Sequence, residues 1–563
     1  MFALLGPNGA GKSATVKVLT TLSHPDSGQA TVAGIDVLRN PVGVRHAIGL
    51  VSQKTSSDPM ATARESLMLA GQIQGMSRAS ARGRALELLA MFGLGNAAER
   101  LAKTFSGGMA RKLDVAIGLV HRPQVLFLDE PTAGLDPEAR AEMWAEIGRL
   151  SAEEQVTVLL TTHYLEEADQ LADRLAVVDH GRIVVEGTPG QLKGELHGDV
   201  VTIELTSPDA APAALARLAR LADLHDAAAD GTSLRARTAS GARAVPALLA
   251  ALEDTGIAVT AGNGSAPVAR RRLPALRGPQ LRGGGMSALT QVRALPARTR
   301  RSDRAQLARH SAYLTARSLR TLWRQPAYAA ATLVQPVIWL LLFGQLFRSV
   351  VHIPGFSLGS GSYLEFITPG VIIMTALFSS TWAGTVYVED TNRGVMDRLL
   401  ASPVRRGAMM IGTLAYQALT TVLQTLVVFG LAYLTGARFP GGAAGILVTV
   451  LAAVLIAMIL ASLSNALALL LRQQEALIGI SQFLVLPLVF LSSAIMDIGL
   501  SPARVRHVAR YNPVDWAVTA SRQALSAGTD WGAVWPRLGF LIALAATMAW
   551  LATRAFGSYQ RSI

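Results

Sequence analysis

Eight residues near the start of the chain have the types and spacing of a phosphate-binding loop. They read Gly6-Pro7-Asn8-Gly9-Ala10-Gly11-Lys12-Ser13 and fit the pattern G-x-x-x-x-G-K-[ST]. The glycines let backbone N–H groups close around the α- and β-phosphates of a nucleotide, at the positive end of the following helix. Lys12 is expected to reach the β- and γ-phosphates, and the Ser13 hydroxyl to bind Mg²⁺.

Further polar residues follow apolar runs downstream. Two adjacent carboxylates, Asp129 and Glu130, come directly after the run 125–128. Gln53 ends the run 48–53, and His163 follows the run 156–162. The sequence Ser106-Gly107-Gly108 opens a helical pattern, and Asp136 stands shortly after the two carboxylates.

The elements that must position these residues alternate between strand and helix. Short apolar runs at 2–5, 30–34, 48–53, 125–128 and 156–162 read as strands, and the segments 14–22, 63–92 and 110–120 have helical periodicity. Such alternation predicts an α/β domain with a mostly parallel sheet and its functional residues at the strand ends.

Taken together, these motifs resemble the ATPase domain of ABC transporters over roughly the first 190 residues. The resemblance implies that ATP is bound by the phosphate loop and that Ala14 lies beside it. Asp129 is similar to the Walker B carboxylate that holds Mg²⁺, Glu130 to the general base that polarises the attacking water, and His163 to the switch histidine at the γ-phosphate. Gln53 resembles the Q-loop residue, which joins the metal site to the membrane domain.

The same resemblance implies a second copy of the chain. Ser106, Gly107 and Gly108 resemble the signature loop, which grips the γ-phosphate bound by the opposite subunit, and Asp136 matches the D-loop aspartate at the dimer seam. A structural alternative for Ser106 is a simple helix cap.

The sequence departs from the family pattern in two places. The family has two strands before the phosphate loop and an aromatic residue that stacks on adenine, whereas this chain begins five residues before Gly6. We expect the true start to lie upstream; otherwise nucleotide affinity is reduced. Ala14 stands where the family usually offers a hydroxyl to the α-phosphate, so a loss of about 1 kcal/mol is expected, the value of one neutral hydrogen bond.

Composition divides the chain into an ordinary first half and an apolar second half. The 563 residues are 50% hydrophobic, and the mean hydropathy is +0.34. The net charge is +13, and much of it lies between 270 and 324, just before the first apolar span. This position favours an anionic membrane leaflet over nucleic acid as the partner, so no nucleic-acid partner is expected. The chain has no cysteine, which excludes disulfides and thiolate metal sites.

We predict four regions: the ATPase domain over 1–197, a small accessory domain over 198–265, a basic linker over 266–305 and a permease over 306–563. The accessory domain reads β-α-β-β-α-β with a hairpin at Asp230-Gly231, and it resembles the appendage of daunorubicin-resistance type exporters. The linker is rich in Arg, Pro and Gly. Because the segment from Met286 resembles the start of a separate permease subunit, we infer a fusion of two proteins that are normally separate in this family. Residues 306–324 read as a basic helix along the inner leaflet.

Six apolar stretches are long enough to cross a bilayer, at 327–347, 364–387, 409–435, 442–471, 476–496 and 533–556. The arginines between the second and third stretches agree with a cytoplasmic side for that loop and for both chain ends. The outer segment 504–522 breaks this rule but is amphipathic, like the short outer helices of type-2 ABC permeases. Polar residues inside the spans are read as helix contacts or as part of a cargo path; they are Gln335, Gln417, Gln424, Asn465 and Gln482.

The loop between the second and third spans resembles the coupling helix that docks on the ATPase near Gln53. The residues that carry this prediction are Glu389, Arg393, Gly394, Asp397 and Arg398. An ordinary charged turn is the alternative.

The resemblance identifies half a transporter, so the working unit is expected to be a homodimer with twelve spans in the cytoplasmic membrane. No charged residue lies deep in the predicted spans, which argues against an ion or proton route and favours an amphiphilic or lipid-like cargo. The resemblance to daunorubicin-resistance type exporters implies export of a daunorubicin-like drug. Two alternatives remain: an exporter of lipids or polysaccharide precursors, and a degenerate or regulatory ATPase that does not transport.

Overall fold

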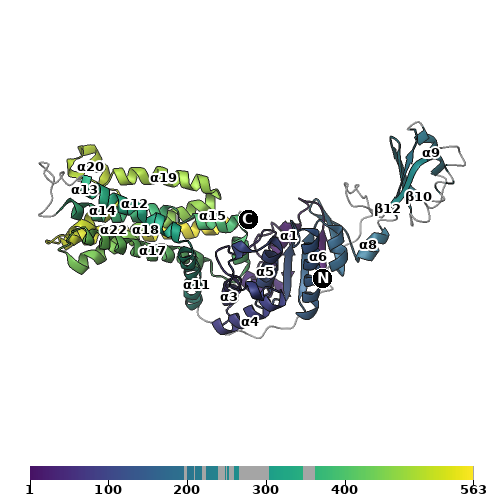
Figure 1. Cartoon of the computed structure of the whole chain (residues 1–563), viewed down its shortest axis with the longest axis horizontal. Helices are drawn as coiled ribbons and strands as arrows, with labels where there is room; N and C mark the ends of the chain where they lie inside the picture. The colour runs from purple at the N-terminus through teal and green to yellow at the C-terminus, as the bar shows by residue number, and fades with distance from the viewer. Residues whose placement is uncertain are drawn as a thin grey trace. The chain divides into compact units, whose positions relative to one another are not determined.

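A computed structural model describes residues 1–195, 199–207, 210–218, 224–238, 248, 250, 252, 259–265, 303–346, 362–496 and 498–561. The chain divides into two compact units. The first holds Met1–Ser13, Ile147–Glu153 and Thr157–Val292, and the second holds Ala14–Glu146, Glu154–Val156 and Arg293–Ile563. The predicted linker falls almost wholly outside the described residues, and Figure 1 follows the rest from purple to yellow.

Four strands of the first unit lie side by side in the order β6 (Thr157–Thr162), β1 (Phe2–Leu5), β7 (Arg174–Asp179) and β8 (Arg182–Gly187). β1 is parallel to both neighbours, with Leu4 opposite Thr161 on one side and Ala176 on the other. β8 returns antiparallel to β7. The middle strands are buried, which explains why they are apolar runs rather than alternating ones. The helices of this part are α7 (Leu165–Leu171) and α8 (Pro189–Glu195).

The accessory part of the first unit is a separate antiparallel sheet. Its strands run in the order β10 (Leu224–Asp230), β11 (Ser233–Thr238), β9 (Asp199–Leu205) and β12 (Val259–Ser265). The hairpin predicted at Asp230-Gly231 joins β10 to β11. α9 (Ala211–Leu218) packs on the sheet through Ala214 and Leu218, whereas the second predicted helix lies mostly outside the described residues.

The ATPase part of the second unit holds the parallel strands β4 (Ile48–Val51) and β5 (Val125–Asp129) and the hairpin β2 (Thr31–Val32) and β3 (Ile35–Asp36). Its helices are α1 (Lys12–Leu19), α2 (Pro41–Ala47), α3 (Ala63–Ile73), α4 (Arg78–Met91), α5 (Gly107–Leu119) and α6 (Pro137–Glu153), of which α1 and α6 each run on into the first unit. The helix predicted over 63–92 is therefore two helices. Each begins at its own side-chain cap: Thr62 forms a capping box with Glu65, and Ser77 accepts from the N–H of Ser80.

The described residues of the membrane part of the second unit form helices joined by turns and short loops. The elements are α11 (Asp303–Trp323), α12 (Pro326–Ile338), a π-helical turn (Trp339–Phe343), α13 (Gly344–Leu346), α14 (Tyr363–Thr381), α15 (Thr385–Asn392), α16 (Val395–Ala401), α17 (Arg406–Leu434), α18 (Gly442–Leu471), α19 (Gln474–Phe490), a 3₁₀ turn (Ile498–Leu500), α20 (Ala503–Ala509), α21 (Pro513–Leu525) and α22 (Trp531–Arg561). Buried side chains of α14, α18 and α21 form the centre of the bundle.

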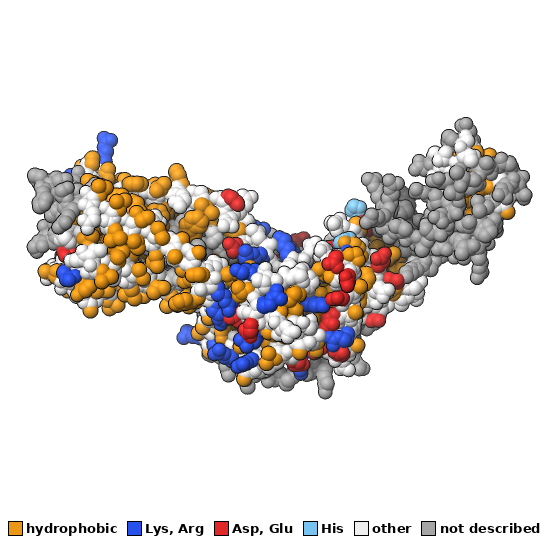
Figure 2. All heavy atoms as spheres, in the orientation of Figure 1, with side chains coloured by type: hydrophobic (Ala, Val, Ile, Leu, Met, Phe, Trp, Pro, Cys, Tyr) orange, Lys and Arg blue, Asp and Glu red, His pale blue; other side chains and the backbone are white. Residues whose placement is uncertain are grey.

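Five helical stretches in the described residues are long and apolar enough to cross a membrane: Ala329–Leu346, Tyr363–Asn392, Arg406–Leu434, Gly442–Leu471 and Trp531–Gly557. The remaining predicted span, 476–496, is the shorter apolar helix α19, which has 17 residues and a length of about 25 Å. At the end of α19, the Asn512 side chain donates to the carbonyls of Leu488 and Leu491, both at 2.8 Å, and so caps the helix. Hydrophobic side chains cover the visible surface of this helical part (Figure 2), as a lipid environment requires.

Two features fix the interior of the bundle. Gln417 of α17 donates to the Ser379 hydroxyl of α14 at 3.2 Å, and Asn465 of α18 donates to the Thr413 hydroxyl of α17 at 3.1 Å, so these two polar residues make helix–helix contacts. At the start of α18, a Cβ on Gly441 or Gly445 would lie only 2.0 or 2.3 Å from the Ala524 carbonyl oxygen of α21. Only glycine allows this approach.

Candidate functional site

The predicted phosphate loop connects β1 to α1 and has the backbone that such a loop needs. Gly9 and Gly11 have positive φ angles of 84° and 102°, which residues with a side chain rarely adopt. A Cβ on Gly6 would lie 2.2 Å from the Val178 carbonyl oxygen. Lys12 is buried, and its ammonium donates to the carbonyls of Gly6 at 2.7 Å and Pro7 at 3.1 Å. The lysine is therefore held inside the loop, with Ser13 and Ala14 in the first turn of α1.

In the second unit, the ends of β4 and β5 bring two predicted site residues together. The strands are parallel neighbours, with Val51 opposite Leu128. The Gln53 amide donates to Glu130 Oε2 at 3.1 Å. Glu130 is 8% exposed and has a φ angle of +47°, an uncommon conformation for a residue with a side chain. Strain of this kind is typical of functional positions.

Arg111 of α5, which the sequence analysis did not single out, holds this corner of the site in place. The guanidinium is buried and donates to five backbone carbonyls: Ser52 at 2.7 Å, Gln53 at 3.3 Å, Asp129 at 3.2 Å, Glu130 at 2.7 Å and Pro131 at 2.6 Å. Its signal in the sequence is a cation three residues before Asp114, on the mostly apolar buried face of the helix that follows Ser106.

The other predicted residues occupy helix and strand ends. His163 follows β6 in the first unit and is exposed, with its ring 4.0 Å from that of Tyr164. Asp136 caps α6 by accepting from the N–H of Ala139 at 2.8 Å. Ser106 caps α5 by accepting from the N–H of Met109 at 3.3 Å, and Ser106 and Gly107 are exposed. The helix cap explains why a serine begins α5. The role of Ser106 toward a second chain stays a prediction.

The predicted coupling loop consists of α15, a left-handed Gly394 with φ +71° and α16. A Cβ on Gly394 would lie 3.3 Å from both the Lys54 Cβ and the Ser52 Oγ, so the loop contacts the two residues that flank Gln53. A groove beside it is lined by Leu50, Ile73 and Ile117 of the ATPase part and by Arg398 and Leu399 of α16.

Charged groups lie beneath this contact. Burial raises the pKa of Asp114 on α5, which Arg398 and Arg111 partly counter. Burial lowers the pKa of Arg398, and the carboxylate of Asp114 opposes that change. Burial also raises the pKa of Asp397, against the attraction of Lys17 and Lys54. Glu389 and Arg393 pair at 3.5 Å near the surface.

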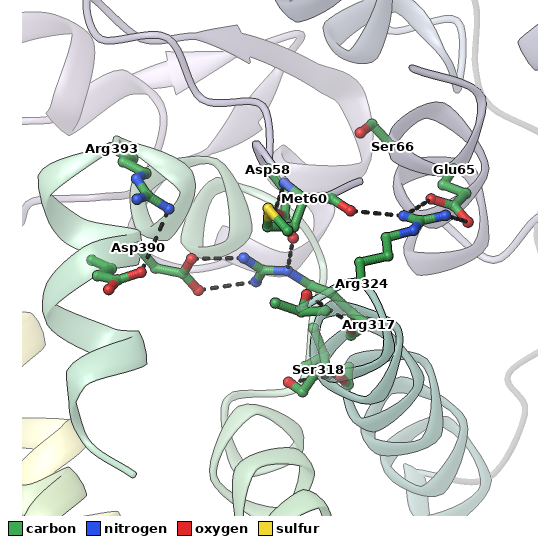
Figure 3. Close-up of polar contacts among 12 residues, drawn as sticks. Asp58, Met60, Glu65, Ser66, Arg317, Ser318, Arg324, Asp390 and Arg393 are labelled. Carbon is green, nitrogen blue, oxygen red and sulfur yellow. Dashed lines mark hydrogen bonds and ion pairs between the residues drawn. The ribbon is translucent and has the colours of Figure 1, made fainter. Parts of the chain in front are cut away.

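Two arginines of α11 carry further ion pairs that the sequence analysis missed (Figure 3). Arg317 binds Asp58 at 2.6 Å and Asp390 at 2.7 and 2.9 Å. Arg324 binds both oxygens of Glu65, at 2.7 and 2.9 Å, and the Met60 carbonyl at 2.7 Å. Their spacing of seven residues, two helical turns, places them on one face of α11 and is the signal that could have found them.

The ion pairs outweigh the cost of burying these charges. Burial opposes the charge of Arg317, but Asp390 and Asp58 overcome it and raise the pKa of the guanidinium. Burial likewise opposes the charge of Asp58, yet Arg317 holds the pKa of this carboxyl below its usual value. Glu65, facing Arg324, has a lowered pKa for the same reason.

Comparison with known proteins decides the family. The chain is 44% identical over 254 residues to a daunorubicin resistance ATP-binding protein of Streptomyces coeruleorubidus, covering 45% of this chain and 79% of that protein. The chain belongs to the ABC transporter family. The family description "ABC transporter" matches residues 1–133, and "ABC-2 type transporter" matches residues 310–526, so this ABC transporter chain carries an ATP-binding part and a multi-pass membrane part.

Two other relatives differ in their described cargo. A daunorubicin/doxorubicin resistance ATP-binding protein of Streptomyces peucetius is 52% identical over 205 residues, covering 36% of this chain and 62% of that protein. A Nod factor export ATP-binding protein of Burkholderia orbicola is 45% identical over 215 residues, covering 38% and 69%. The ABC transporter chain thus spans less than two thirds of the Streptomyces peucetius protein.

Proposed function

We propose that this chain is an ATP-driven exporter that moves an amphiphilic compound, such as a daunorubicin-like drug, out across the cytoplasmic membrane. The observation that carries the proposal is the hydrogen bond between Gln53 and Glu130, 3.1 Å long, in a chain that also holds its own membrane part. Glu130 is the proposed base, and Gln53 lies next to the loop of the membrane part that contains Gly394.

In this mechanism the phosphate loop binds ATP. The Lys12 ammonium, buried in the loop, donates to the carbonyls of Gly6 and Pro7 without ATP and would donate to the β- and γ-phosphates when ATP binds. Glu130 accepts a proton from the attacking water, and Arg111 keeps the backbone of Glu130 in its strained conformation. His163 is the proposed contact of the γ-phosphate.

Mg²⁺ is the proposed cofactor, held by Ser13, Gln53 and Asp129. These side chains supply a hydroxyl, an amide and a carboxylate oxygen, and oxygen ligands are those that Mg²⁺ prefers in nucleotide sites. When bound, the ion would neutralise charge that develops on the β- and γ-phosphate oxygens.

Catalysis is proposed to need two copies of the chain. In this family a signature loop completes the phosphate loop of the opposite subunit, and Ser106 and Gly107 are exposed at the start of α5, as that role requires. The pair would hold both ATPase parts and all chain ends on the cytoplasmic side. Binding of ATP would close the ATPase pair and open the membrane parts outward, and hydrolysis would reset them.

A different cargo class is the second candidate. A relative that is 45% identical over 215 residues is described by the export of a different compound, Nod factor, so we keep an exporter of a lipid or polysaccharide precursor as the alternative. The resistance profile of a deletion strain separates them, because only the drug exporter lowers the toxicity of daunorubicin. If the chain binds ATP without transporting, its deletion should change neither the resistance to daunorubicin nor the export of a lipid or polysaccharide precursor.

The variant Glu130→Gln tests the proposal. Removing the base should lower ATP turnover by about 10²–10⁴-fold and leave ATP bound, and export of daunorubicin from intact cells should stop. The matched control Glu138→Gln changes an exposed glutamate in the first turn of α6 and should keep both activities. Unchanged export with Glu130→Gln would refute the proposal.

A further inference from the structure

Arg317 of α11 joins two segments that are far apart in the sequence. Its Nε donates to Asp58, which lies five residues after Gln53, and its two Nη atoms donate to the two oxygens of Asp390, at the inner end of the helical stretch Tyr363–Asn392. Figure 3 shows the guanidinium between the two carboxylates. We name Arg317, Asp58 and Asp390 the Arg317 bridge.

The three hydrogen bonds of the Arg317 bridge fix the directions of both carboxylates relative to the guanidinium. The guanidinium is planar, and it uses its edge toward Asp58 and its fork toward Asp390, so both carboxylates are held in defined directions. The side chains are only 15%, 11% and 11% exposed, so water screens these pairs little. Lysine has a single ammonium and cannot reproduce both contacts.

Asp58 belongs to a segment that leads back to the proposed base. Gln53 donates to Glu130 at 3.1 Å, and the Ser56 N–H and hydroxyl donate to Asp114 of α5 at 3.1 and 3.2 Å. Asp58 accepts from the N–H of Met60 at 2.9 Å and from Arg317. The segment 53–60 is therefore fastened at the ATPase site, at α5 and at α11, which makes it a stiff link.

The second arginine of α11 provides an internal comparison. Arg324 also binds a carboxylate of the ATPase part with both Nη atoms, but the structure gives it no contact with the loop that holds Asp390 among the described residues. Arg324 therefore attaches α11 to α3. Arg317 attaches α11 both to the segment that holds Asp58 and to the membrane span that ends at Asp390.

We propose that Arg317 is a positioning residue for transport: it makes the segment 53–60 and the inner end of the second membrane span move together, so that a change at Gln53 reaches Asp390 through its guanidinium. This inference rests on the proposed function and adds a route beside the contact of Gly394. Breaking the bridge should leave ATP binding and basal ATP turnover unchanged. The membrane helices should then no longer respond to bound ATP.

The test uses the full chain in lipid nanodiscs, in the Glu130→Gln background so that ATP stays bound. Amide hydrogen exchange is measured with and without ATP for peptides from the outer halves of α14 and α17, which needs no knowledge of the cargo. The variants are Asp58→Asn, Asp390→Asn, Arg317→Lys and the control Arg324→Gln. Asparagine keeps the shape of aspartate, so these variants test the bridge even if a change at Arg317 prevents folding.

We expect ATP to change exchange in the parent and in Arg324→Gln, and the Asp58→Asn, Asp390→Asn and Arg317→Lys variants to weaken that response by about tenfold or more, the factor for losing one charged hydrogen bond. ATP binding should persist in all of them. A response in Asp58→Asn and Asp390→Asn equal to that of the parent would overturn the role of the bridge. A parent that itself does not respond to ATP would overturn the proposed export mechanism, and this inference with it.

Discussion

At the scale of single residues, the proposed chemistry depends on one backbone position held in an uncommon conformation. Glu130 has a φ angle of +47°, and its carbonyl accepts from Arg111 at 2.7 Å. The same guanidinium donates to Ser52 and Gln53. The helix that begins with the predicted signature loop therefore also fixes the backbone of the predicted base and of the Q-loop.

The variant Arg111→Met should destabilise the ATPase part strongly. The two buried carbonyls that Arg111 binds, of Glu130 and Pro131, lose their donor at about 1–3 kcal/mol each, so the free energy of unfolding should fall by about 2–6 kcal/mol. The measurement is a denaturant unfolding curve of the purified chain. The neighbouring Lys112→Met removes only an ion pair with the exposed Glu142 and should cost about 0–1 kcal/mol. Equal losses in the two variants would contradict the assigned role of Arg111.

Asp58 should give the chain a dependence on acid pH. Because the pKa of Asp58 is lowered in the folded chain, its ion pair stabilises the fold above the unfolded value of about 3.9, and this contribution disappears as the pH falls through the lower folded value. The melting temperature of Asp58→Asn should therefore lie below that of the parent near neutral pH, and the difference should shrink below about pH 4. The exposed Asp26→Asn serves as control, and a difference that grows in acid would show that the sign is wrong.

Which residues the sequence predicts depends on how far away their partners are. The phosphate loop, Gln53 and Glu130 belong to short motifs, and neighbouring strand ends bring the last two together. Arg111 and Arg317 act through partners up to 259 residues away, so a local pattern can single out the arginine but cannot identify its partners. The buried carboxylate of Asp58 looks ordinary in the sequence because its arginine lies on another element.

At the scale of elements, α16 is positioned by a single left-handed residue. Gly394 turns the chain from α15 into α16 and lies against Ser52 and Lys54. The turn direction therefore decides whether α16 meets β4 and α3. The groove that receives Arg398 and Leu399 is formed by those elements.

The variant Gly394→Ala should weaken this docking. A side chain at φ +71° costs about 1–2 kcal/mol, and the new Cβ would lie 3.3 Å from two neighbours. We expect less cargo transported per ATP hydrolysed, measured in proteoliposomes with daunorubicin. Gly83→Ala, in the open interior of α4, should keep the parental ratio. A parental ratio in Gly394→Ala would argue for an ordinary charged turn.

Element boundaries were harder to predict than element types. Apolar runs identified the strands β4 to β6 and the membrane helices, because burial on both faces leaves an uninterrupted hydrophobic sequence. The hydrophobic run that starts near 476 continues past the end of α19, since Ala494 and Ile495 remain apolar although Asn512 has already capped the helix at Leu488 and Leu491. Distant capping cannot be read from hydropathy.

At the scale of the whole molecule, one chain supplies one predicted phosphate loop and one predicted signature loop, in which Ser106 and Gly107 are exposed. The described residues hold five long apolar helices and the shorter α19, which the proposal counts as one half of the membrane domain. This inventory is what the proposed homodimer requires. Whether two chains share their sites can be tested with defects placed in different chains.

Two inactive variants should restore activity when they are mixed. Lys12→Ala removes the phosphate-binding lysine, and Gly108→Asp places a carboxylate in the signature loop, so each homodimer should be inactive. A mixed dimer has both defects in one site and none in the other, so coexpression should recover about a quarter of the parental ATP turnover for random pairing in a two-fold assembly. No recovery, together with activity of the parent as a monomer by native mass spectrometry, would contradict shared sites.

The contact between α18 and α21 limits how such chains can recombine. Gly441 and Gly445 leave no room for a side chain beside the Ala524 carbonyl. Suppose that two related genes recombine between the segments that encode these helices. The hybrid protein then packs α18 from one parent, with or without the two glycines, against the Ala524 backbone of α21 from the other parent. We expect such hybrids to fold only where the parent that contributes α18 has glycine at both positions, so the sequence of α18 limits which α21 it can accept.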